Sequence, residues 1–237
     1  MASTKVKALV IEAKDSKEKD KLVTLFTLEE GKFFVNFRGV RSAKAKLKAA
    51  KEIFTFAEFV IEDTKAGNIV TDANIIDTFS PLRADLDKYY EACSCLDIVK
   101  KLISNSPDPA LFIEIVKALK AISYDNAPKN YSLVKFLVTI FENMGYKLNF
   151  DTCSSCKARL TGKRYLNLDY GEIVCANCRQ MTSIEVAPAT ISALKILRDT
   201  PYEKLKTVKL GGDGETRALN LLAENFEWRF GSKFFLA

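Results

Sequence analysis

The 237-residue chain contains no histidine, and this absence excludes several kinds of active site. Without imidazole there can be no Ser-His-Asp or Cys-His catalysis, no HExxH metalloprotease and no histidine metal ligand. Glycine and proline are also few, at 10 and 6 residues, which argues against a long disordered or collagen-like segment. No apolar run approaches the roughly 20 residues that span a bilayer, so the sequence predicts no membrane partner.

The overall composition is typical of a globular protein in a reducing compartment. Hydrophobic residues make up 48% of the chain and charged residues 28%. Residues 1–11 lack the apolar core and cleavage site of a secretory signal, so we expect a cytoplasmic protein. The sequence has neither a phosphate-binding glycine motif nor the clustered carboxylates of a two-metal nuclease, so no motif in it indicates an enzyme.

The pattern of the first 80 residues predicts five short strands separated by turns. β-branched and aromatic residues are concentrated in residues 6–13, 22–28, 33–37, 54–60 and 69–76. Strand number and size match the five-stranded Greek-key barrel called the OB-fold, and a small sandwich is the alternative. We expect an OB-fold nucleic-acid-binding domain over residues 1–80.

Beyond residue 80 the apolar period becomes helical. Apolar residues recur at three- and four-residue steps, in most segments bounded by glycine or proline, over residues 82–103, 111–122, 131–144, 190–198 and 215–230. The sequence therefore predicts an α-helical domain over residues 81–237. Together with the barrel it makes an α+β multidomain protein.

Four of the six cysteines stand in two CxxC pairs, Cys153 with Cys156 and Cys175 with Cys178, separated by 18 residues. This spacing is typical of a four-cysteine zinc site because each CxxC turn directs two thiolates at one point. A hairpin between the pairs is expected to bring them together, as in a zinc ribbon inserted over about residues 149–185. Four thiolates leave no open coordination position, so the predicted Zn²⁺ is structural, one per chain. Two disulfides or four unrelated core thiols are the alternatives.

Residues 32–51 carry seven positive and no negative side chains, whereas the whole chain has a net charge of +6. Charge this concentrated creates a local field, and phenylalanines beside it suit a single-stranded nucleic acid whose bases can stack. We predict DNA contacts, largely independent of sequence, from Lys32, Arg38, Arg41, Lys44, Lys46, Lys48 and Lys51. The alternative is a solvated lysine-rich loop, with Phe33, Phe34 and Phe37 facing the core.

Several short motifs follow one another along the chain. Gly31 begins a predicted strand that leads to Arg38-Gly39-Val40-Arg41-Ser42 and, after the basic loop, to Phe54-Thr55-Phe56. Met144-Gly145-Tyr146 stands just ahead of the first cysteine pair, and Asn225-Phe226-Glu227-Trp228-Arg229-Phe230-Gly231 closes the last predicted helix. In this order the motifs resemble the RecO family of recombination mediators over nearly the whole chain.

The resemblance implies a non-enzymatic protein of bacterial DNA repair and recombination. Such a protein binds single- and double-stranded DNA, anneals complementary strands and partners with RecR. It also contacts the C-terminal tail of single-stranded DNA-binding protein and helps to load RecA, in the cytoplasm and in association with the nucleoid. The residues themselves leave two other classes open. One is a zinc-ribbon and OB interaction module of the transcription or translation machinery that binds RNA or protein, and the other is a hydrolase that uses scattered carboxylates.

Overall fold

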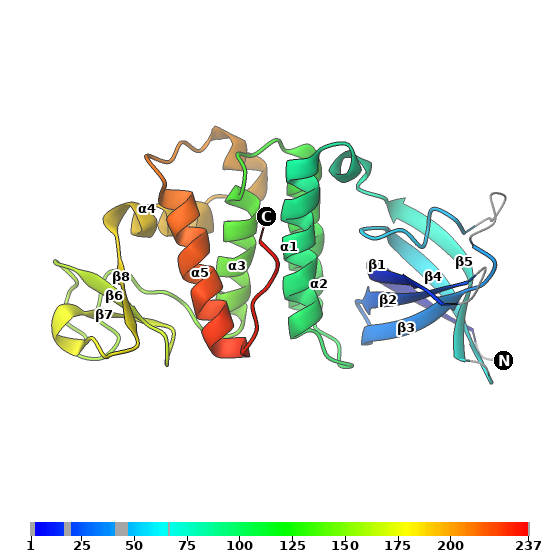
Figure 1. Ribbon diagram of the computed structural model, residues 1–237, viewed down its shortest axis with the longest axis horizontal. Coiled ribbons are helices and arrows are strands. Elements are labelled where there is room, and N and C mark those ends of the chain that lie inside the picture. The colour runs from blue at the N-terminus through cyan, green and yellow to red at the C-terminus, as the bar shows by residue number, and fades with distance from the viewer. Residues whose placement is uncertain (1–2, 17–19, 41–46, 66, 237) are drawn as a thin grey trace.

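Five strands in the first third of the chain close into a barrel in the order β1-β2-β3-β5-β4 (Figure 1). The strands are β1 Ser3–Asp15, β2 Lys21–Thr27, β3 Gly31–Phe37, β4 Phe56–Thr64 and β5 Gly67–Asp77. The computed structural model describes residues 3–16, 20–40, 47–65 and 67–236. Neighbouring strands are antiparallel except β3 and β5, which run parallel and pair at Asn36 and Ile69. The predicted five-stranded, OB-like barrel is confirmed.

Alternation along the strands decides which side chains fill the barrel. The interior side chains of the strands are Val6, Ala8, Val10, Val23, Leu25, Val35, Phe37, Ala57, Phe59, Ile61 and Val70. On the outer side, Phe26 of β2 and Phe56 of β4 are covered by a helix, because their rings lie 5.3 and 5.8 Å from that of Phe112. One side of the barrel therefore belongs to the core of the helical part.

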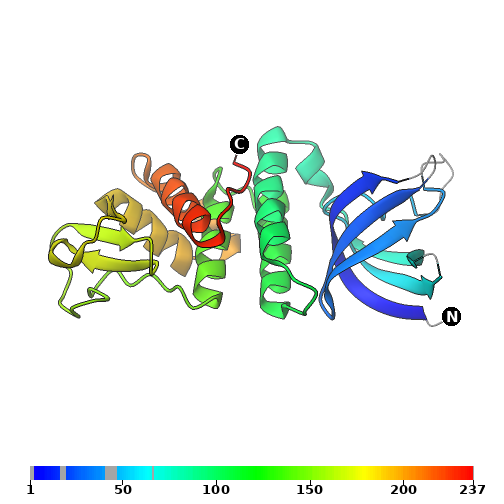
Figure 2. The same cartoon turned by 60° about the horizontal axis from the view of Figure 1, so that its bottom comes forward.

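The helices occupy the middle of the molecule, between the barrel and a second, smaller sheet (Figures 1 and 2). They are α1 Leu86–Leu102, α2 Pro109–Tyr124, α3 Tyr131–Asn143, α4 Pro188–Asp199 and α5 Gly214–Phe230. Short 3₁₀ turns precede α1 at Ser80–Arg83 and follow α4 at Tyr202–Thr207, so the first helix begins later than the apolar period predicts. None of the helices in the described ranges combines the length and apolarity that crossing a bilayer requires.

The smaller sheet has the order β7-β6-β8, with β6 Arg164–Asn167, β7 Glu172–Cys175 and β8 Ser183–Val186. The β6–β7 hairpin is the predicted one, whereas β8 was not predicted. The Arg229 side chain of α5 holds this hairpin, since its guanidinium lies 3.9 Å from the Tyr146 ring centroid and donates to the Leu168 carbonyl at 3.4 Å. The last helix thereby fixes the cysteine-bearing sheet to the helices.

The junction between barrel and helices is tight at the start of β3. Gly31 has a φ of 76°, and a Cβ built on it would lie 2.2 Å from the carbonyl oxygen of Ser106. The next N–H, that of Lys32, donates to the Ser104 carbonyl at 2.8 Å. Glycine is therefore required here both for its backbone conformation and for the close approach of the α1–α2 loop.

We predict that Gly31→Ala lowers the free energy of unfolding by about 3 kcal/mol, because it combines left-handed strain of about 1 kcal/mol or more with a backbone clash. Gly39→Ala is the matched control, since Gly39 has a similar φ of 63° but no atom of the described residues within 4 Å of its Cβ position. Urea unfolding of the two variants measures the difference. An equal decrease in the free energy of unfolding for the two variants would show that the α1–α2 loop makes no close steric contact with β3 at Gly31.

Helix α3 is capped by a side chain from a different helix. Its N-cap residue Asn130 has a φ of 68° and makes no side-chain cap. Instead the Leu133 N–H donates to the carboxylate of Glu91 on α1 at 3.0 Å. Burial raises the pKa of Glu91 to about 7, although backbone hydrogen bonds from Leu133 and Asn130 and the charge of Lys129 oppose the rise.

This carboxylate makes stability depend on pH in a defined direction. Between the ordinary glutamate pKa of 4.5 and the folded value of about 7, the native state binds more protons than the unfolded state. The free energy of unfolding therefore falls as the pH rises through this window, by up to about 3 kcal/mol from Glu91. We expect Glu91→Gln to remove that slope. Urea midpoints of both proteins between pH 4.5 and 8 provide the measurement, and parallel profiles would contradict the assignment.

Candidate metal site and nucleic-acid interface

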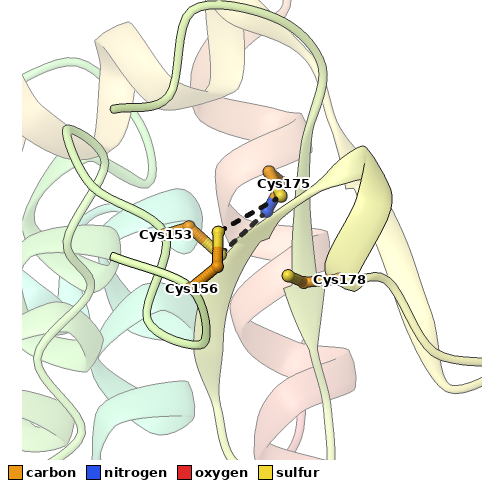
Figure 3. Close-up of side chains that lie close together, drawn as sticks. All are labelled: Cys153, Cys156, Cys175 and Cys178. Atoms are coloured by element: carbon orange, nitrogen blue, oxygen red, sulfur yellow. Dashed lines mark hydrogen bonds between the residues drawn. The ribbon is translucent and has the colours of Figure 1, made fainter. Parts of the chain in front are cut away.

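The four predicted cysteine ligands meet at one point. The Sγ atoms of Cys153, Cys156, Cys175 and Cys178 all lie within 4.8 Å of one another (Figure 3). The Cys156 and Cys175 sulfurs are 3.9 Å apart. Four sulfurs at about 2.3 Å from a central ion have edges of about 3.8 Å, so the donor set fits a tetrahedral, thiolate-binding metal ion. Elsewhere in the described ranges no group of three or more Cys, Asp or Glu side chains has this geometry.

Backbone hydrogen bonds build the first cysteine turn. The Cys153 N–H donates to the Ala158 carbonyl at 2.8 Å, and the Lys157 N–H returns to the Cys153 carbonyl at 2.9 Å. Lys157 takes a φ of 60°, which closes the turn. The Ser154 N–H donates to the Ile173 carbonyl at 3.0 Å and so attaches the turn to β7, the strand that ends at Cys175. The end of β7 and the 3₁₀ turn Ala176–Cys178 that follows it thus supply the second cysteine pair.

The protein itself stabilises one thiolate in this cluster. Burial works against ionisation of Cys153, but backbone N–H groups, first those of Cys156 and Cys175, outweigh it and lower the pKa of Cys153 to about 6. The Ser155 hydroxyl favours the Cys178 thiolate, yet hydrogen bonds with the neighbouring thiols raise the pKa of Cys178 to about 11. Four thiols this close therefore all ionise only when a cation is bound between them.

Four of the seven basic residues predicted to contact DNA, Lys32, Arg38, Lys48 and Lys51, lie within the described ranges, and they differ in position and exposure. Lys32 is the second residue of β3 and Arg38 follows its last, so the two lie about 20 Å apart along the strand. Arg38 and Lys48 are exposed. Lys51 is buried, with its side chain 7% exposed and its ammonium paired with the Glu52 carboxylate, so it is not available to a phosphate. Three of the seven, Arg41, Lys44 and Lys46, lie outside the described residues.

The described parts of the segment between β3 and β4 close one end of the barrel. Val40 and Ala50 are buried in the barrel core, and Leu47 packs against them. The Gly39 N–H donates to the Asp20 carboxylate at 2.9 Å, which ties the start of the segment to the start of β2. The apolar residues among the lysines therefore have a structural role, and Arg38 and Lys48 remain on the outside.

The three phenylalanines of β3 have different environments. Phe37 is fully buried in the barrel, and Phe33 is half-buried at its mouth. Phe34 is 50% exposed on the outer face, and the Lys32 ammonium lies 5.3 Å from its ring centroid. The alternative in which all three face the core is therefore wrong for Phe34.

Charge is distributed unevenly along the sequence that forms the barrel. Residues 56–77, which hold β4 and β5, contain Lys65 as their only cation against five carboxylates, those of Glu58, Glu62, Asp63, Asp72 and Asp77. Residues 20–52, which hold β2, β3 and the closing segment, contain eight cations against four carboxylates. The sequence of residues 20–52 is therefore net positive and that of residues 56–77 net negative, and three of the eight cations, Arg41, Lys44 and Lys46, lie outside the described residues.

Comparison with known proteins gives the same family over both parts of the chain. The family model described as Recombination protein O N terminal matches residues 1–79, and the one described as Recombination protein O C terminal matches residues 83–234. DNA repair protein RecO of Clostridium novyi is 29% identical over 210 residues, which cover 88% of this chain and 82% of that protein. DNA repair protein RecO of Clostridium acetobutylicum is 28% identical over 225 residues, 94% of this chain and 90% of that protein.

Proposed function

The chain belongs to the RecO family of DNA repair proteins, and from this membership we propose that it is a non-enzymatic recombination mediator. In this proposal it binds single- and double-stranded DNA largely without sequence specificity and anneals complementary strands. Together with RecR it helps to load RecA onto DNA coated by single-stranded DNA-binding protein, whose C-terminal tail it contacts. It acts in the bacterial cytoplasm, in association with the nucleoid.

The uneven charge of the barrel is the observation that supports this proposal most directly. In this proposal the excess cations of residues 20–52 attract the phosphates of two strands to one small domain. The repulsion between the phosphates of the two strands falls when lysine and arginine neutralise their charges, while the base edges stay free to pair. Arg38 and Lys48 are the exposed members of this set within the described ranges, and we extend it to Arg41, Lys44 and Lys46.

The four cysteines are proposed to hold one structural Zn²⁺. When bound, the ion cross-links the two cysteine turns and supplies no reaction, because four thiolates fill its coordination sphere. The cysteine residues themselves shape the sheet that α5 holds through Arg229. The proposed role of this module is that of a scaffold.

Strand annealing tests the proposal. Complementary oligonucleotides are coated with the cognate single-stranded DNA-binding protein and mixed with wild-type protein or with a variant in which Arg38, Arg41, Lys44 and Lys46 are replaced by glutamate. A control variant reverses four lysines of the helical part and its C-terminal tail, Lys204, Lys206, Lys209 and Lys233, of which the first three are exposed and Lys233 has a 78% exposed side chain. We expect fast annealing by wild type and control and slow annealing by the barrel variant. No acceleration by wild type, or clear preference for structured RNA at matched salt, would contradict the proposal.

A further inference from the structure

A hollow opens where the barrel meets the loop between α1 and α2. Its walls come from the β2–β3 turn, the first half of β3, the start of β5 and the α1–α2 loop. Along β3 it lies between two points at which other segments bind the strand. At one, the Lys32 N–H donates to the Ser104 carbonyl of the α1–α2 loop, and at the other Asn36 pairs with Ile69 of β5. Its volume of about 560 Å³ is in the range of small-ligand sites.

Phe34 is the aromatic wall of this hollow. It lies on the outer face of β3, and half of its surface is exposed. The β2–β3 turn, the start of β5 and the α1–α2 loop line the same hollow. Lys32 is two residues earlier and so on the same face, with its ammonium 5.3 Å from the ring centroid. An exposed ring with a cation beside it is the arrangement on which unpaired bases stack while their phosphates are neutralised.

The polar groups of the hollow favour a base over a phosphate. Asn68 from the barrel and Asn105 from the helical loop line it. The Asn68 amide is oriented by its hydrogen bond to the Phe34 carbonyl at 3.5 Å. Glu29 and Glu30 line the hollow on the side of the β2–β3 turn, where carboxylates repel a phosphate but accept hydrogen bonds from N–H groups, as Glu29 already does from the Lys7 N–H at 3.2 Å.

We propose that this hollow binds one unpaired nucleobase of single-stranded DNA, stacked on Phe34, with Lys32 on the neighbouring phosphate. The inference rests on the proposed DNA binding and adds a subsite that both the barrel and the helical part build. A base paired within a duplex is not available for stacking in the hollow. The subsite therefore gives the protein a preference for single strands that its non-specific cations alone cannot supply.

Binding of matched single-stranded and duplex oligonucleotides, followed by fluorescence anisotropy at one fixed salt concentration, tests the subsite. We expect Phe34→Ala to weaken single-strand binding by about 5- to 150-fold, the range for loss of one stacked base, and to leave duplex binding unchanged. Phe34→Trp should keep the wild-type preference. Tyr170→Ala is the matched control, because Tyr170 is a 63% exposed aromatic on the cysteine-bearing module.

A second measurement uses the wild-type protein and so does not depend on the folding of a variant. An oligothymidylate carrying one 5-iodouracil is irradiated in the complex, and the cross-linked peptide is identified by mass spectrometry. We expect the cross-link at Phe34. A cross-link confined to other residues, or a Phe34→Ala variant with an unchanged ratio of single-strand to duplex affinity, would overturn the subsite while leaving phosphate binding intact. If the wild-type protein binds neither the single-stranded nor the duplex oligonucleotide, the proposed function is overturned as well.

Discussion

Replacing Cys153 or Cys175 by serine is expected to abolish stoichiometric metal binding and to destabilise the protein by at least about 4 kcal/mol. Freshly purified, reduced wild-type protein should contain about one zinc per chain by elemental analysis. The loss spreads beyond the module, because Leu166 and Ile173 of its sheet are fully buried in the core that the helices form. The melting temperature should fall accordingly, and a chelator should have the same effect on the wild type.

Cys93→Ser is the control for this prediction. Cys93 lies half-buried on α1, outside the four-sulfur cluster, so its replacement should leave the metal content unchanged. DNA affinity should survive loss of a cysteine ligand better than stability does, since the ligands are proposed to be scaffold. Purified, reduced wild-type protein without any metal, or a Cys153→Ser variant as stable as wild type, would show that the cluster is only a group of core thiols.

Reversing the charges of Arg38, Arg41, Lys44 and Lys46 is expected to weaken DNA binding at least about 100-fold. The loss should be about equal for all sequences, because contacts to phosphates carry no sequence information. Lys51 is left out of this variant because it is buried against Glu52, where a reversed charge would change stability instead. The melting temperature of the variant should match the wild type, which separates lost binding from lost folding. Unchanged affinity at low salt would contradict the prediction.

Local patterns predicted most of the helices and strands and the meeting of the four cysteines. The alternation of buried and outward side chains in β3 and the turn at Gly31 depend on residues that are close in sequence. A CxxC spacing likewise determines where its two sulfurs can point. Burial within the basic segment could not be predicted in the same way. The sequence around Lys51 resembles that around Lys48, yet Lys51 is buried and Lys48 is exposed. The difference arises because the segment covers one end of the barrel.

The aromatic residues show the same limit. Phe34 and Phe26 both face outward from the barrel, yet α2 covers Phe26 while Phe34 stays open beside the α1–α2 loop. Phe54 extends the apolar alternation of β4 in the sequence, but its φ of 69° places it in the turn before the strand. Leu86 fits the apolar period of α1 and is nevertheless 64% exposed. For Phe26 and Phe34 a distant segment of the chain decides which face is covered, and periodicity contains no information about that segment.

The idea that positive charge on the β2–β3 side of the barrel binds polyphosphate is tested most directly by salt dependence. The observed binding constants of the wild type and of the four-residue charge-reversal variant are measured on duplex and single-stranded oligonucleotides over a series of NaCl concentrations. If each replaced residue contacts one phosphate, the slope of log K against log salt should become shallower by about 3.6 on duplex and about 2.8 on single strands. Parallel slopes for the two proteins would mean that DNA is bound elsewhere on the molecule.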